Sequence, residues 1–262
     1  MFTDILSGLS GALVGAILGL VGGGGSVLAV PLLVYGVGVS STHVAIGTSA
    51  LAVAASAFAN LIGHWRAGTV KWRCGLTFAA AGVVGAFAGS MVAKAIDGAH
   101  LLALFGALMI VVGIAMFLKR KAEGDPEVRL TGASARYLLP WLIAGGLGVG
   151  LLSGFFGIGG GFLIVPALMV ATGMSLPFAI GTSLIAVTAF GAATATSYAI
   201  SGLIDWRIAA IFIIGGVLGG IGGGALGRLL AGRKGVLGTV LAAVIVAVGL
   251  YVVARSIGWP IG

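Results

Sequence analysis

Two very long stretches of this chain carry no charged residue, one between Asp4 and Arg66 and the other between Arg136 and Asp205. Four shorter uncharged stretches each have about the length of one membrane crossing: 74–93, 101–118, 208–227 and 235–254. A helix that rises ~1.5 Å per residue crosses a hydrocarbon core of ~30 Å in about 20 residues. The pattern therefore predicts an all-α polytopic membrane protein.

The composition argues against a soluble domain, a disulfide-stabilised fold and a nucleic-acid-binding protein. Only 8% of the 262 residues are charged, whereas 60% are apolar and 49 are Gly. A soluble domain carries roughly 25% charged residues, so lipid is expected to cover this exterior. The single cysteine, Cys74, excludes a disulfide framework within the chain. The net charge of +8 does not indicate a nucleic-acid partner, because the basic residues form short clusters between uncharged stretches, as the positive-inside rule produces.

Glycine and proline breaks divide the long stretches, so that each half of the chain holds about five hydrophobic segments. The expected segments are 5–21, 26–38, 43–63, 74–96 and 100–118, then 140–156, 161–172, 177–200, 206–228 and 235–254. The short regions 22–38 and 157–172 are expected to be Gly-broken or re-entrant, which predicts about 8–10 membrane helices. The first segment carries Asp4 and no basic n-region, so we expect it to be retained and not cleaved as a signal peptide.

The two halves are copies of each other. A shift of 135 aligns 11–40 with 146–175 at 13 identities in 30 positions, and a shift of 134 aligns AIGTS at 45–49 with AIGTS at 179–183. We therefore divide the chain into an N-terminal membrane repeat (1–118), a cytoplasmic linker (119–136) and a C-terminal membrane repeat (137–262).

Charge indicates how the copies are oriented. Loop 66–73 has net charge +3 and its counterpart 205–207 has none, whereas loop 94–97 has none and its counterpart 228–234 has +3. Equivalent loops thus face opposite sides, as in inverted repeats with an odd number of crossings. Placing the linker and the two +3 loops in the cytoplasm collects 11 of the 14 Lys and Arg there and leaves both termini periplasmic.

A parallel arrangement with four crossings per half is the competing model. It places 10 basic residues on one side of the membrane and leaves the exchanged loop charges unexplained. We therefore favour inverted repeats.

Runs of glycine mark the candidate binding site. The sequences GGGGSVLAVP at 22–31 and GIGGGFLIVP at 157–166 break the chain inside the membrane, where free N–H groups are tolerated only if they are buried or line a cavity. Each run is expected to open a short helix whose N-terminus binds an oxyanion without a cationic side chain. Inverted halves would bring the two helix starts together near the midplane.

Glycine in membrane helices also serves close packing. We prefer that interpretation for the isolated glycines Gly11, Gly15, Gly19, Gly82, Gly85 and Gly89, and the binding site for the consecutive ones.

Hydroxyl and amide side chains near these breaks complete the predicted site. The candidate substrate-binding residues are Gly22, Gly23, Gly24, Gly25, Ser26, Thr48, Ser49, Asn60, Ser153, Gly157, Gly159, Gly160, Gly161, Thr182 and Ser183. The AIGTS hydroxyls serve equally well as helix caps or as ligand donors, and Asn60 serves equally well in a helix–helix hydrogen bond. His43 could line the transport path, but we favour a position at the membrane interface for it. The loop cations could form an anion vestibule, but we favour a role in topology at the membrane ends, where Trp72 and Trp206 are expected as anchors.

Enzyme signatures are weak or absent. The sequence contains no HExxH, Walker A or CxxC motif and no plausible Ser-His-Asp set, and the glycine runs follow membrane helices and not a Rossmann strand. We expect no catalysis, no cofactor and no metal.

The segment GLLSGFFGIGGGFLIVPAL at 150–168, followed by AIGTS, resembles the TauE/SafE family of sulfite and organosulfonate exporters, and GAILGLVGGGGSVLAVPLL at 15–33 is similar to the same pattern. The resemblance implies a bacterial inner-membrane permease that exports a small sulfur-containing oxyanion. The first copy has Gly23 and Ser26 where the second has Ile158 and Gly161, so the two half-sites need not be equivalent.

Resemblance and residues together predict anion transport by alternating access. Export is favoured because an anion leaving an inside-negative cell gains ~2.3 kcal/mol per charge per 100 mV, and no carboxylate lies mid-span to couple uptake. Uptake of thiosulfate, sulfate or a sulfonate is an alternative, as is a non-transporting anchor subunit. The expected partners are a small anionic substrate and the lipid bilayer, with no nucleic acid and with a homodimer left open.

Overall fold

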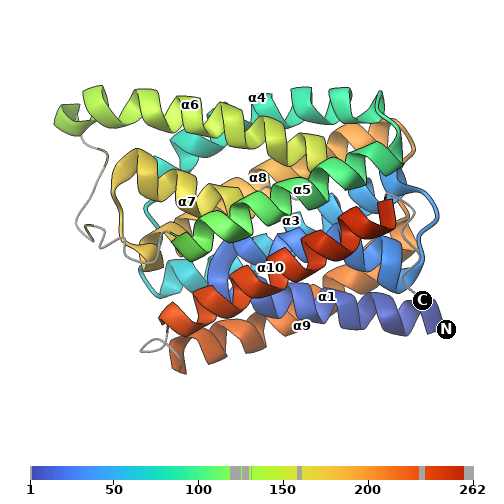
Figure 1. Cartoon of the computed structure of the whole chain (residues 1–262). Helices are drawn as coiled ribbons and strands as arrows, with labels where there is room; N and C mark the ends of the chain where they lie inside the picture. Colours follow the sequence, from blue (N-terminus) through green and yellow to red (C-terminus); the bar gives the residue numbers. More distant parts are fainter. Residues whose placement is uncertain are drawn as a thin grey trace.

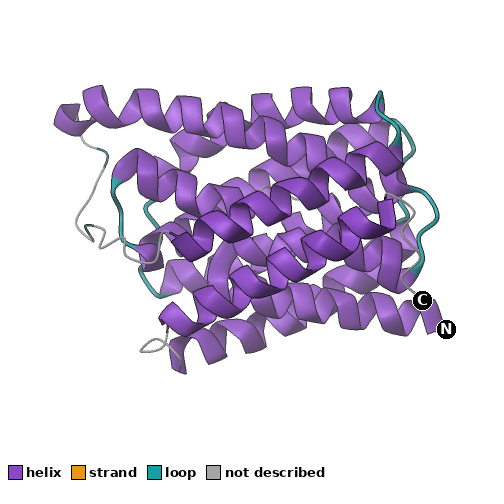
Figure 2. Ribbon diagram, viewed as in Figure 1, coloured by secondary structure: helices purple, strands orange, loops and turns teal. Residues whose placement is uncertain are grey.

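The computed structural model describes residues 2–118, 125, 130, 132–157, 161–229 and 234–256. These residues form helices joined by short turns, and they contain no β-strand (Figure 2). The helices are α1 (Phe2–Val21), η1 (Gly22–Leu28), α2 (Ala29–Pro31), η2 (Leu32–Val37), α3 (Thr42–Arg66), α4 (Trp72–Lys94), α5 (Gly98–Leu118), α6 (Gly132–Phe156), α7 (Gly161–Thr172), α8 (Leu176–Ile200), α9 (Trp206–Leu229) and α10 (Lys234–Ser256). Within the described ranges, seven helices are long and apolar enough to cross a membrane. The predicted all-α polytopic membrane protein is confirmed.

The first glycine run differs from the expected single short helix. Residues 22–28 form a 3₁₀ helix, α2 has three residues, and η2 is a π-helix. Four consecutive glycines have no side chains that favour α-helix, and Pro31 has no N–H and crowds the carbonyl four residues earlier, which disturbs regular α-helix in the turn before it. The second break meets expectation more closely, because α7 has the predicted bounds.

Helix α6 begins at residue 132, earlier than the predicted 140, and contains Pro140. The predicted segment started at Pro140, whereas the apolar span of the helix already begins at Ser134 and includes Tyr137, Leu138 and Leu139.

Isolated glycines pack helices of one half against helices of the other, and these helices lie side by side in Figure 1. The first helix of each half packs on the fourth helix of the opposite half, which pairs α1 with α9 and α4 with α6. A Cβ on Gly15 would overlap the backbone of Gly216, and a Cβ on Gly82 would overlap Phe190 and the backbone of Gly146. The close-packing interpretation is therefore confirmed for these glycines. Helices α3 and α8 pack against each other, as do α5 and α10.

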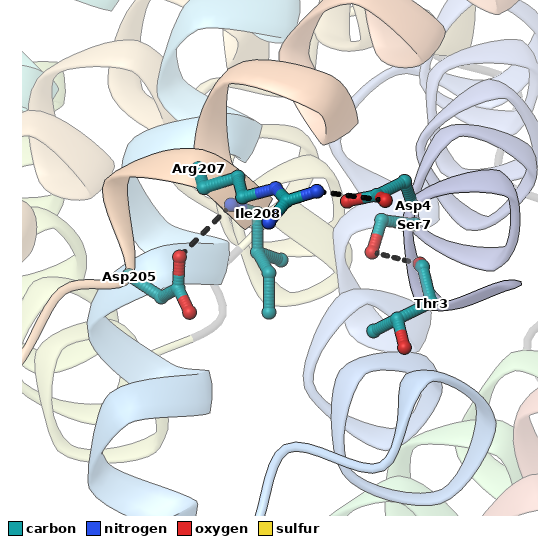
Figure 3. A network of polar contacts seen from close by, with 6 residues as sticks. All are labelled: Thr3, Asp4, Ser7, Asp205, Arg207 and Ile208. Atoms are coloured by element: carbon teal, nitrogen blue, oxygen red, sulfur yellow. Dashed lines mark hydrogen bonds and ion pairs between the residues drawn. The ribbon is translucent and has the colours of Figure 1, made fainter. Parts of the chain in front are cut away.

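Polar contacts gather the start of α1 and the α8–α9 connection at one end of the bundle. Arg207 Nη2 lies 3.0 Å from Asp4 Oδ2, and Asp205 Oδ1 accepts a hydrogen bond from the N–H of Ile208 at 3.0 Å, which caps α9 (Figure 3). The last turn of α4 reaches the same end, because Lys94 Nζ donates to Ser201 Oγ at 2.9 Å.

The opposite end holds the α3–α4, α5–α6 and α7–α8 connections. Arg73 Nη1 donates to the carbonyl of Leu130 at 3.5 Å, and Asp125 N donates to the carbonyl of Gly173 at 2.8 Å. In Figure 1 this end lies at the left, and the N-terminal end of α1 and the C-terminal end of α10 lie at the right.

Candidate functional site: the glycine crossing

The two glycine runs meet in the interior of the bundle. A Cβ on Gly23 would overlap Gly161, and a Cβ on Gly161 would overlap the carbonyl of Gly23, so only glycine permits this contact. We call Gly22–Gly25, Gly157 and Gly161 the glycine crossing; all of them are buried. The predicted site residues Gly159 and Gly160 lie outside the described residues.

Left-handed backbone starts each break. Gly22 has φ +72° and Gly157 has φ +68°, and the two positions are equivalent in the copies. Residues with a side chain adopt this conformation at a cost. Ile180 packs against Gly22, and Ile46 packs against Gly157, so each AIGTS motif covers the break of the opposite half.

The serines of the AIGTS motifs join the halves at the crossing. Ser183 Oγ accepts a hydrogen bond from Gly23 N at 3.4 Å and donates to the carbonyl of Ile180 at 2.7 Å. Ser49 Oγ lies 2.9 Å from the carbonyl of Ile46 and 3.4 Å from the carbonyl of Gly157. Each serine is fully buried. Each combines a short hydrogen bond within its own helix with a long contact to the other half.

The neighbouring threonines hold loops and not their own helices. Thr48 Oγ1 accepts from the N–H of Asp205 at 3.0 Å, and Thr182 Oγ1 accepts from the N–H of Lys71 at 2.9 Å. The start of α3 is capped instead by Ser41, which accepts from Val44 N. The cap alternative for Thr48 therefore does not describe this structure.

Gly47 and Gly181 let these loops approach. A Cβ on Gly47 would overlap the carbonyl of Leu203, and a Cβ on Gly181 would come within 2.5 Å of the carbonyl of Thr69. Sequence reasoning did not single out these glycines, although the repetition of AIGTS was a signal for them.

The remaining predicted residues divide between the crossing and helix packing. Ser26 Oγ donates to the carbonyl of Gly23 at 2.8 Å, inside the crossing. Ser153 is fully buried, and its Oγ has no hydrogen-bond partner among the described residues. Asn60 Nδ2 donates to the carbonyl of Ser56 at 2.9 Å, and the amide packs against Gly220 of α9. The hydrogen bond that the structure gives Asn60 lies within α3, so its contact with α9 is one of packing and not the expected helix–helix hydrogen bond.

The crossing is packed closed in this conformation. A groove of about 380 Å³ lies between α3 and α8, and its lining is mostly apolar and includes Phe58 and Trp206. Another of about 330 Å³ lies beside Tyr35 and Tyr251. The lining of neither groove includes the glycine crossing. An anion would reach the amide N–H groups and hydroxyls of the crossing only if the halves moved apart.

Comparison with known proteins places the chain among transporters. The family model described as sulfite exporter TauE/SafE matches residues 7–252. A probable membrane transporter protein of Xylella fastidiosa (strain 9a5c) is 50% identical over 251 residues, covering 94% of each chain. The probable membrane transporter protein YunE of Bacillus subtilis (strain 168) is 27% identical over 270 residues, covering 97% of each chain. No solved structure matches the chain significantly.

Proposed function

The chain belongs to the TauE/SafE family of membrane transporters, and from this premise we propose that it exports a small sulfur-containing oxyanion, such as sulfite or an organosulfonate, across the bacterial inner membrane. The glycine crossing is the observation that carries the proposal. Two left-handed breaks, one from each copy, lie buried in one place, and each is contacted by a serine of the opposite half. A site shared between repeats is where transporters of repeated architecture bind their substrates.

Backbone and hydroxyl groups suit an anion at the crossing. Amide N–H groups carry positive partial charge and need no buried cation, whose desolvation would be costly. The cross-half contacts of Ser49 and Ser183 are both 3.4 Å long, at the outer limit of a hydrogen bond. An oxyanion that replaces these long contacts can accept from the Gly23 N–H and from both serine hydroxyls, each of which then turns its single proton from the carbonyl of its own helix to the anion.

Alternating access follows if the halves are inverted repeats that rock about the crossing. The reciprocal packing of α1 on α9 and of α4 on α6 supports this relation. The polar contacts at the two bundle ends support this relation as well. At each end they join connections that the loop charges assign to the same side of the membrane. With inverted repeats, the basic end of the bundle is cytoplasmic and both termini are periplasmic.

Efflux is the direction that needs no coupled ion. The membrane potential drives an anion outward with ~2.3 kcal/mol per charge per 100 mV. Flux in vesicles of known orientation decides between efflux and uptake.

The decisive experiment measures labelled-sulfite flux in proteoliposomes that contain the full chain. Ser49→Ala combined with Ser183→Ala should reduce the maximal rate at least about tenfold, because each removed hydroxyl takes part in the anion contact. Ser90→Ala is the matched control, since Ser90 is equally buried and also donates to a carbonyl of its own helix, that of Phe87 at 2.7 Å. Equal flux in the double variant and the control would remove the serines from the site. Absence of sulfite, sulfate, thiosulfate and sulfonate flux in the wild type would refute transport of this anion class.

A further inference from the structure

Among the described residues, three polar atoms near the C-terminal end of α8 are buried without hydrogen-bond partners: His43 Nδ1, Ser197 Oγ and Tyr198 Oη. Ser197 is 2% exposed and Tyr198 is fully buried. Folded proteins pair nearly all buried polar groups with protein groups, ordered water or bound ions, so these groups are expected to have partners that the described residues do not supply. The glycine crossing does not account for them.

These groups come from three helices that meet at this end. The His43 ring, in the first turn of α3, stacks on Tyr198 with 6.5 Å between ring centroids. Lys94, at the end of α4, places its ammonium 5.7 Å from the centroid of the same ring. That ammonium donates to the carbonyl of Ser197 at 3.1 Å and to Ser201 Oγ at 2.9 Å, which uses two of its three N–H donors.

The chemistry of the cluster selects an anion. Hydroxyl, imidazole and ammonium groups all donate hydrogen bonds, and Lys94 adds a positive charge. The carboxylate of Asp97, which follows α4, is exposed and accepts from the N–H of Ala99 at 3.0 Å. Its oxygens also lie 3.3 Å from His100 Nδ1, so this carboxylate is engaged in its own loop.

The opposite end of the bundle provides an internal comparison. A shift of 134 places His64 of the first copy at the position of Tyr198. His64 Nδ1 lies 3.0 Å from Thr69 Oγ1, so the equivalent position is paired within the protein. Unpaired polar groups at this position are therefore a feature of one end and not a consequence of the repeated fold.

The cluster lies close to the glycine crossing along α3. Gly47, one helical turn after His43, packs against Tyr198. Ser49 is two residues further, about 9 Å from His43 at the rise of an α-helix.

We infer that His43, Lys94, Ser197 and Tyr198 form an oxyanion subsite at the end of the bundle where α1 begins, on the path between solvent and the glycine crossing. This inference rests on the proposed function, and it assigns that function a second contact for the same anion.

The test measures thermal stabilisation of the detergent-solubilised full chain by sulfite and by sulfate. The background is Ser183→Ala, which weakens the crossing and leaves the end subsite intact. We expect both anions to raise the melting temperature in this background. Adding Tyr198→Phe and Lys94→Met should raise the anion concentration for half-maximal stabilisation at least about tenfold, because a charge-assisted and a neutral hydrogen bond are lost. Thr196→Val is the matched control on α8, where an exposed hydroxyl donates to the carbonyl of Ala192.

A structural role of Lys94 is tested separately with Ser201→Ala. This variant removes one acceptor of the ammonium and keeps the charge, so anion stabilisation should be unchanged. Stabilisation that survives Tyr198→Phe with Lys94→Met, or that is absent from the Ser183→Ala background, would overturn the subsite. The result is independent of flux: stabilisation without sulfite flux refutes the proposed function alone, and flux without subsite-dependent stabilisation refutes the subsite alone.

Discussion

The backbone N–H of Gly23 points to the hydroxyl oxygen of Ser183, 3.4 Å away, and so joins the first half of the chain to the second. Ser49 makes the reciprocal contact with the carbonyl of Gly157. Both contacts are long and buried, and both connect a serine of a repeated motif with a left-handed break of the other copy. Two halves tied in this way can separate without losing the hydrogen bonds that keep each serine in its own helix.

The close approach of the two glycine runs makes Gly23→Ala a damaging substitution although it adds only one methyl group. The added methyl group would overlap the Gly161 backbone, and overpacking of this kind costs about 1–3 kcal/mol or more. A melting temperature in detergent and sulfite flux should both fall. Gly63→Ala is the control, because a Cβ there meets no atom within 4 Å and Ala favours helix over Gly. A Gly23→Ala protein as stable and active as Gly63→Ala would show that the runs do not meet.

The threonines of the AIGTS motifs are expected to contribute to stability more than to transport. Thr182→Val keeps the shape of the side chain but leaves the N–H of Lys71 without its acceptor, which costs about 1–3 kcal/mol. Thr48→Val should have a similar effect on the N–H of Asp205. Denaturant unfolding measures both. The reference is Thr196→Val, whose exposed hydroxyl should matter by less than about 0.5 kcal/mol; equal losses in all three variants would contradict the assigned contacts.

Two polar contacts near the start of α9, a helix cap and an exposed ion pair, are expected to differ in strength and in salt dependence. Asp205→Ala removes the cap on Ile208 N and should destabilise the protein by about 1 kcal/mol at any salt concentration. Asp4→Asn removes an ion pair in which the Arg207 side chain is 75% exposed, so its effect should be smaller than that of Asp205→Ala and should shrink in high salt. Melting temperatures at two ionic strengths provide the measurement. A salt-independent Asp4→Asn effect larger than that of Asp205→Ala would reverse this ranking.

Membrane sidedness is testable in cells. Topology reporters fused after residue 125 and at the C-terminus should report opposite sides of the inner membrane, with residue 125 cytoplasmic. The physical reason is that the basic loops resist translocation. Reporters that give the same side would refute inverted halves and favour parallel repeats.

The chain's uncharged stretches and glycine runs determined the helical membrane class, nearly all helix positions and the two breaks. These features follow from local physics: a helix must be apolar over the bilayer's thickness, and consecutive glycines do not sustain an α-helix. The isolated glycines of α1 and α4 were likewise interpreted correctly as packing residues, because small residues at helical spacing have few other uses in a membrane.

Only the tertiary structure decided which polar groups remain free. Thr48 and Ser49 are adjacent in an identical repeated motif, yet Thr48 accepts from a loop N–H and Ser49 contacts a glycine break. No local pattern marks Tyr198 and Lys94, because their contacts with each other and with His43 depend on α3 beginning where α4 and α8 end. Hydrogen-bond partners far apart in the chain are set by packing between halves, and no local pattern encodes them.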